Sequence, residues 1–277
     1  MVAMTYTTKF FLAFICLKGL IESYLDNRNK MHILRNRNAV PEKFAQKITL
    51  EDHQKAADYS VAKIKTGQFF HYIGYAILIG WTVLGGLDAL NSVVKGFGYS
   101  QVWSGIIFFL AFSFINSLIS IPETLYKTFV IEQKYGFNKT TMKTFITDLV
   151  KGLVLGLIIG VPILFGILTI MEKLGEYWWV YAWAFLSGVQ LLLMWGYPTF
   201  IAPLFNKFSP LEDGEVKDKI LELLKRTGFE SNGLFVMDAS IRSSHGDAYF
   251  TGFGKNKRIV SIFFTKHKSD SFRNRFK

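Results

Sequence analysis

The chain has 277 residues, of which 50% are hydrophobic and 16% are aromatic, and its mean hydropathy is positive at +0.25. A soluble domain of this length rarely has such a composition, so we expect a membrane protein. The net charge of +11 would suit nucleic-acid binding, but no stripe of basic and aromatic residues accompanies it, so we expect no nucleic-acid partner.

A weakly apolar segment covers residues 5–25. Lys18 and Glu22 interrupt it, but they stand one helical turn apart and can pair with each other. The same charges break the apolar middle that a cleaved signal peptide requires, and no small-residue cleavage site follows. We therefore expect an uncleaved span, although hydropathy alone leaves it open. Cys16 is the single cysteine, which excludes an internal disulfide.

Later stretches are long and apolar enough to cross a bilayer, for which about 20 residues are needed. They cover residues 66–87, 96–122, 152–171 and 177–206. In the third stretch, Gly152, Gly156 and Gly160 recur every fourth residue, which predicts close approach of another helix, within the molecule rather than in a dimer. With the first segment, the sequence predicts about five transmembrane helices.

Lysine and arginine residues collect in alternate loops. The loops 26–65 and 123–143 and the region after residue 207 are strongly basic, whereas the loops near Lys95 and Lys173 are not. This is the positive-inside pattern, and it predicts that the basic loops and the C-terminal region lie in the cytoplasm. Basic loops of this kind also meet anionic lipid headgroups, so membrane lipid is an expected partner.

The chain changes character after Phe208. Ser209 suits an N-cap and Pro210 suits the first helical position, so we predict a helix that starts here and ends at Gly228. Short β-like runs follow at residues 233–238, 248–251 and 258–264, and the last two are predicted to form a hairpin. A helix and about three strands bury too little for a core of their own. We therefore predict an incomplete cytoplasmic α+β segment after the membrane helices.

Specific motifs lie in the last part of the chain. Residues 198–215 read PTFIAPLFNKFSPLEDGE and residues 242–260 read RSSHGDAYFTGFGKNKRIV, while an earlier loop at 129–140 reads FVIEQKYGFNKT. This pattern, following a long apolar segment, resembles the type I CAAX prenyl proteases, which are integral-membrane zinc endopeptidases. The resemblance covers roughly residues 10–260 and implies a membrane domain at 1–207 and the start of a metalloprotease domain at 208–260.

The zinc site of that family is an HExxH helix, which is not present in this sequence. HExxH chemistry needs two histidines one helical turn apart, with a glutamate between them that activates water. The histidines here show no such spacing: His32, His53, His71, His245 and His267. We therefore predict no catalytic residue and no metal ligand in this chain. Zinc is expected only in the full-length family enzyme.

The resemblance also implies a place for the substrate. In the family, the peptide is thought to lie as an added strand against an edge strand, which corresponds here to Gly246, Asp247, Ala248, Tyr249 and Phe250. Such binding uses backbone hydrogen bonds and so needs no particular side chain. The family usually has Asn where this chain has Asp247, so the role of an acidic group there is open. Packing of Tyr249 and Phe250 in the strand core is an equal alternative.

The implied function is that of the N-terminal part of a membrane zinc metalloendopeptidase, which processes the C-termini of prenylated or other membrane-associated polypeptides. Residues 261–277 form an atypical basic tail, for which we hypothesise a frameshift or a premature stop. Without the zinc motif, we expect the chain alone to be inactive. The alternative is a non-catalytic peptide-binding or scaffold protein, or one half of a split protease. The expected location is the endoplasmic reticulum in a eukaryote and the inner or plasma membrane in a bacterium.

Overall fold

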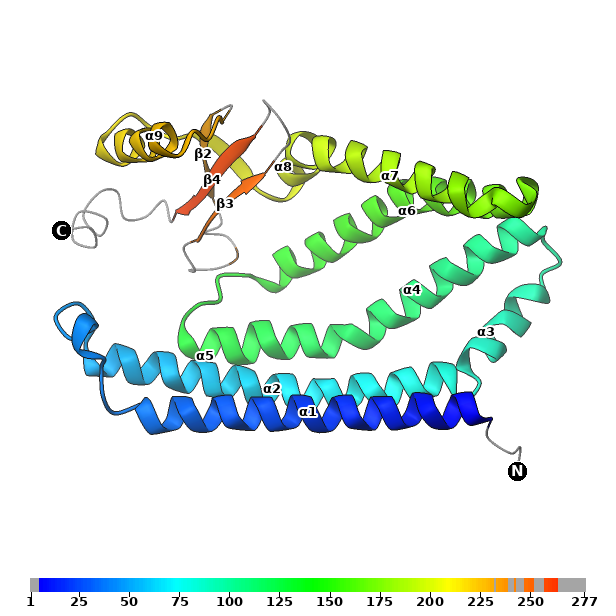
Figure 1. Ribbon diagram of the computed structural model, residues 1–277, viewed down its shortest axis with the longest axis horizontal. Coiled ribbons are helices and arrows are strands. Elements are labelled where there is room, and N and C mark those ends of the chain that lie inside the picture. The colour runs from blue at the N-terminus through cyan, green and yellow to red at the C-terminus, as the bar shows by residue number, and fades with distance from the viewer. Residues whose placement is uncertain (1–4, 232, 239–241, 243–246, 252–256, 264–277) are drawn as a thin grey trace. The chain divides into compact units, whose positions relative to one another are not determined.

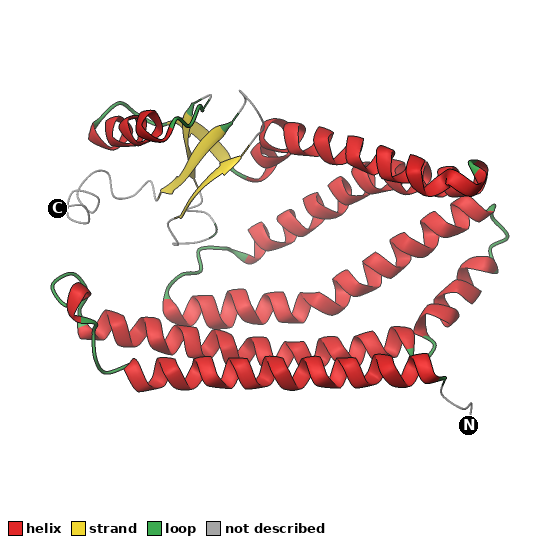
Figure 2. Cartoon of the chain, in the orientation of Figure 1, coloured by secondary structure: helices red, strands yellow, loops and turns green. Residues whose placement is uncertain are grey.

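The computed structural model describes residues 5–231, 233–238, 242, 247–251 and 257–263, and helices account for most of them (Figures 1 and 2). The chain divides into two compact units, Met1–Tyr135 and Gly136–Lys277, which are described separately. The expected division of the sequence at residue 207 rests on a change in composition and stays a prediction.

The first unit consists of helices. α1 and α2 pack along each other, and the side chains of Thr5 and Thr49 cap their N-termini (Figure 1). Lys18 and Glu22 form the expected ion pair on α1, at 2.8 Å between Nζ and Oε1, and Tyr75 of α2 donates to the same carboxylate. The unit contains α1 (Tyr6–Asn36), η1 (Glu42–Phe44), α2 (Leu50–Thr82), α3 (Gly86–Lys95), α4 (Gln101–Leu125), η2 (Tyr126–Glu132) and α5 (Gln133–Tyr135).

The apolar stretch 66–87 is not one continuous helix, as the sequence had suggested. α2 ends at Thr82 and α3 starts at Gly86, with a bend of 50° between them. Gly85 adopts φ +82°, a left-handed conformation that L-residues with a side chain rarely adopt. The Gly85-Gly86 pair is therefore the physical reason for the break.

The second unit begins with α6 (Met142–Lys173), which Thr141 caps by accepting a hydrogen bond from the Thr144 backbone N–H. η3 (Gly175–Tyr177), α7 (Trp178–Gly196), the π-helical turn η4 (Tyr197–Ile201) and α8 (Ala202–Phe205) follow. α6 and α7 pack against each other at Gly166, where an added Cβ would lie 2.5 Å from Cζ of Phe185.

Within the described part of the second unit, no helix packs closely against the glycine row on α6. An added Cβ at Gly152, Gly156 or Gly160 would meet no described atom within 4 Å. The close approach occurs instead at Gly166, outside the four-residue repeat. Within this unit α7 crosses α6 nearer its C-terminal end, and intramolecular packing through the glycine row stays a prediction.

Within the described residues, the structure has three helical stretches long and apolar enough to cross a membrane, or four if α2 and α3 are one bent span. The three are Gln101–Tyr135, Met142–Lys173 and Gly175–Phe205. The first segment is helical, as part of α1, but α1 is not among them. An α-helical membrane protein is therefore confirmed, and the count of about five spans stays a prediction.

A four-stranded sheet follows the membrane helices, in the order β1-β2-β4-β3. β1 (Lys207–Pro210) pairs antiparallel with β2 (Leu234–Asp238), β2 pairs parallel with β4 (Arg258–Phe263), and β4 pairs antiparallel with β3 (Asp247–Thr251). The expected hairpin is therefore present, and its connecting residues 252–256 lie outside the described part. Leu234 and Val260 are buried in the middle of the sheet.

The helix start expected at Ser209 and Pro210 was wrong. Both residues lie in β1, opposite Val236 and Phe235 of β2, and the Leu211 N–H donates to the Leu234 carbonyl at 2.9 Å. Pairing with a strand more than twenty residues away outweighs the local capping signal. The helix α9 (Glu215–Thr227) starts later, and Gly228 at φ +65° ends it as expected.

Candidate functional site

The predicted peptide-binding segment coincides with the edge strand of the sheet. β3 pairs with β4 on one side, with Tyr249 opposite Val260, and no described strand pairs with its outer edge. Ala248, Tyr249 and Phe250 are all exposed. An edge strand presents a row of backbone groups that can pair with a further strand. Its geometry therefore suits the addition of an extended peptide.

Two aromatic residues of β3 lie on opposite faces of the sheet, because successive side chains of a strand alternate. Phe250 contacts Phe229 edge-on, with 5.7 Å between ring centroids, and is still 71% exposed. The Tyr249 hydroxyl lies 3.9 Å from the Met237 sulfur, and burial, with a smaller contribution from Tyr197, raises the pKa of Tyr249. Tyr249 is thus partly packed, whereas Phe250 offers most of its ring to solvent.

The remaining predicted residues are only partly described. Asp247 begins β3 and lies opposite Ile262. Gly246 lies outside the described residues, as do Ser243, Ser244 and His245 of the RSSHG motif. The assignment of the five residues to substrate binding therefore stays a prediction.

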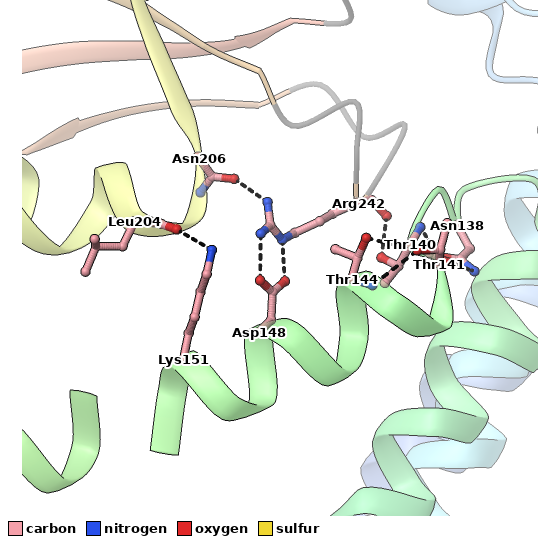
Figure 3. A network of polar contacts seen from close by, with 9 residues as sticks. All are labelled: Asn138, Thr140, Thr141, Thr144, Asp148, Lys151, Leu204, Asn206 and Arg242. Carbon is pink, nitrogen blue, oxygen red and sulfur yellow. Dashed lines mark hydrogen bonds and ion pairs between the residues drawn. The ribbon is translucent and has the colours of Figure 1, made fainter. Parts of the chain in front are cut away.

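Arg242, just before this strand, is the centre of a polar network (Figure 3). Its Nε and Nη2 donate to the two carboxylate oxygens of Asp148 on α6, at 2.7 and 2.8 Å, and its Nη1 donates to Oδ1 of Asn206 at 2.8 Å. Its backbone carbonyl accepts from the Lys139 N–H at 3.1 Å and from the Thr140 hydroxyl at 3.0 Å. Hydrogen bonding to Asp148 raises the pKa of Arg242 above its ordinary value, so the guanidinium is always charged.

This network joins the three sequence motifs. Asn138 of the GFN loop accepts from the Thr140 N–H at 2.7 Å, Asn206 belongs to PLFNKF, and Arg242 opens RSSHG. The sequence interpretation used these motifs only as marks of resemblance and did not identify Arg242, Asp148 or Asn206. The available signal was a set of polar residues next to predicted apolar helices, and nothing in the sequence indicated that they meet.

The described residues do not supply a zinc site. They contain no group of three or more His, Cys, Asp or Glu side chains placed to hold a metal ion. The histidine spacing of the whole sequence also lacks the two-His helical turn that such a site uses. Zinc therefore does not fit the donors described here, and no chemical step is derived through it.

Fold and site define a helical membrane protein with a small sheet, and Arg242 beside this sheet forms hydrogen bonds with a membrane helix. Comparison with known proteins specifies the family. Residues 29–207 match the family model described as the CAAX prenyl protease N-terminal domain with five membrane helices. The chain belongs to the CAAX prenyl protease family, as its motifs had indicated.

Relatives of known name agree with this assignment. The chain is 38% identical to the CAAX prenyl protease 1 homolog of Caenorhabditis elegans, over 81% of this chain and 50% of the relative. It is 36% identical to CAAX prenyl protease 1 of Saccharomyces cerevisiae, over 90% of this chain and 57% of the relative. The crystal structure of Ste24p from S. mikatae superposes with a TM-score of 0.82 at 36% identity, covering 94% of this chain and 63% of that one. The chain thus spans about half to three-fifths of the length of these relatives.

Proposed function

We propose that this chain provides the membrane domain and the peptide-binding strand of a CAAX prenyl protease. The whole enzyme hydrolyses a peptide bond near the C-terminus of a prenylated polypeptide. The observation that carries the proposal is the outer edge of β3, which lies where the family resemblance places the substrate and which no described strand pairs. The names of the relatives support the reaction and the class of substrate.

Binding by strand addition explains the character of this edge. Backbone hydrogen bonds from β3 supply affinity for any extended peptide, and pockets for alternate side chains supply selectivity. Phe250 adds a mostly exposed ring beside this edge, suited to an apolar side chain or to part of a prenyl chain. The substrate strand would thereby become the fifth strand of the sheet.

Catalysis requires groups that residues 1–277 do not contain. In the family resemblance, zinc supplies the activated water, and its ligands come from an HExxH helix. We propose that these residues bind peptide without hydrolysing it. We also propose that the chain crosses the membrane about five times and that its sheet faces the cytoplasm, the side that the basic loops favour. Its proposed location is the endoplasmic reticulum membrane in a eukaryote, or the inner or plasma membrane in a bacterium.

The test uses the purified 277-residue chain in lipid nanodiscs and a fluorescent farnesylated peptide ending in a CAAX sequence. A photoreactive phenylalanine analogue replaces Phe250, and the control carries it at Leu223 of α9, which is exposed to a similar degree, 55% against 71%. We expect a crosslink from position 250 only, no cleaved peptide by mass spectrometry, and no stoichiometric zinc. A crosslink of equal yield from position 223 would contradict binding at β3, and cleavage by the purified chain would contradict the absence of a catalytic centre.

A second candidate function is binding without any catalytic partner. The observation that favours it is that β3 is an outer strand of the described sheet, in a part of the chain that has no metal-binding group among its described residues. Addition of a separately produced HExxH-containing segment of a relative distinguishes the two. Restored hydrolysis supports a split or interrupted protease, whereas unchanged binding without hydrolysis supports a scaffold.

A further inference from the structure

Arg242 lies close in sequence or in space to the start of both edge strands of the sheet. It lies shortly before β3, with residues 243–246 between them, and it donates to Asn206, which immediately precedes β1. β1 and β3 are the two edges in the order β1-β2-β4-β3. The same guanidinium binds Asp148 on α6, so one side chain links this membrane helix to Asn206 before β1 and lies five residues before β3 (Figure 3).

The chemistry of this contact favours a defined geometry. Arg242 and Asp148 form a bidentate pair, in which two parallel N–H···O bonds fix direction as well as distance. The side chains of both are 25% exposed, so solvent screens the pair less than a surface ion pair. A lysine at this position would retain the charge but lose the planar fork.

The position along the chain limits where the peptide-binding strand can lie. Asp247 follows Arg242 by 247 − 242 = 5 residues. An extended chain spans at most about 3.6 Å per residue, so the first residue of β3 must lie within about 18 Å of Arg242. The backbone carbonyl of Arg242 is also held, by the Lys139 N–H and the Thr140 hydroxyl.

We propose that Arg242 is a positioning residue that sets the outer edge of β3 relative to α6, with Asp148 and Asn206 as its partners. This inference rests on the proposed function of β3 as the peptide-binding strand. Arg242 does not itself touch the peptide. It holds the strand at the place where a peptide entering beside the membrane helix can pair with it.

The chain offers a matched control on the same helix. Lys151 of α6 donates to the Leu204 carbonyl of α8 at 2.8 Å, so it also links the membrane helix to the segment before the sheet (Figure 3). Among the described residues, Lys151 forms no hydrogen bond with Arg242 or with β3. Loss of Lys151 therefore removes a tie between α6 and α8 but leaves the proposed anchor in place.

The experiment measures hydrogen–deuterium exchange and peptide binding on the full 277-residue chain in nanodiscs. In Arg242→Ala we expect exchange at residues 247–251 to become at least tenfold faster, with residues 234–238 of β2 unchanged. The Kd for the farnesylated peptide should rise at least tenfold. Arg242→Lys should recover only part of both effects, the swap Arg242→Asp with Asp148→Arg should recover more, and Lys151→Ala should resemble the parent.

Three results would overturn the inference. Equally faster exchange in β2 and β3 would indicate general destabilisation, and unchanged exchange in β3 would indicate that Arg242 does not anchor this strand. Faster exchange in β3 with an unchanged Kd would show that the anchor does not contribute to peptide binding. If Arg242→Ala does not fold, Asn206→Ala removes a single contact and carries the same expectations at smaller amplitude. If the parent itself does not bind the peptide, the proposed function fails, and the exchange measurements still decide whether Arg242 anchors β3.

Discussion

Gly166 allows α6 and α7 to pack closely, and a methyl group there should separate them. An added Cβ would lie 2.5 Å from Cζ and 2.9 Å from Cε1 of Phe185. Carbon atoms ordinarily pack at about 3.5–4.0 Å, so the shortfall is roughly 1 Å. Overpacking of this kind costs about 1–3 kcal/mol when the neighbour cannot move away fully.

A control on the same helix isolates this steric cost. Gly156→Ala introduces the same methyl group where no described atom lies within 4 Å. Both substitutions gain about 1 kcal/mol of helix propensity, which cancels when they are compared. Gly166→Ala should therefore be less stable than Gly156→Ala by about 1–3 kcal/mol, which corresponds to a melting temperature roughly 2–12 °C lower.

The assay is thermal unfolding of the purified protein in detergent, followed by tryptophan fluorescence. Gly166→Ala should lower the melting temperature less in the Phe185→Ala background than in the parent, because the ring that the methyl group would contact is absent there. Equal melting temperatures for Gly166→Ala and Gly156→Ala would refute the close contact of α6 with α7 at this point.

Three further predictions concern local structure. Thr141→Ala removes the cap of α6 and should cost about 0.5–2 kcal/mol in thermal unfolding, whereas Thr141→Ser should retain most of the stability. Gly85→Ala places a side chain at φ +82° and should cost about 1 kcal/mol, measured in the same way; a stabilised variant would contradict the left-handed turn. A hydrogen bond from Lys217 lowers the pKa of Asp213, so any stability it contributes is present above the unfolded pKa and lost as pH falls below about 4. Because Asp213 is exposed, Asp213→Asn should unfold like the parent at pH 7, and a clear difference in melting temperature would contradict this.

The sequence predicted those elements that local patterns determine. The last three apolar stretches overlap α4, α6 and α7–α8, and the β-like runs overlap β2, β3 and β4. Failures occurred where distant contacts or backbone conformation decide the outcome. Ser209 and Pro210 look like a helix start, but strand pairing with β2 takes them. The Gly85 break was missed because glycine is common within membrane helices and its φ is not visible in sequence.

The candidate site was predictable only as a strand. The residue pattern predicted a strand at 248–251 and the resemblance an edge strand at 246–250, and β3 covers residues 247–251. The anchor was not predictable, because Arg242 and Asp148 are 94 residues apart and charged residues at such separations have many possible partners. Resemblance identified the motifs one by one, and the structure shows what holds them together.

The strand order has a consequence for synthesis of the protein. β4 lies between β2 and β3 in the sheet but follows both in the chain, so the partner of β3 is made last. Until residues 258–263 have left the ribosome, β3 has no strand to pair with, and β1 and β2 form only a two-stranded ribbon, which is at best marginally stable. The proposed peptide-binding edge therefore forms only when translation of this region is complete, and until then the edges of β2 and β3 that later pair with β4 are exposed to chaperones and to aggregation.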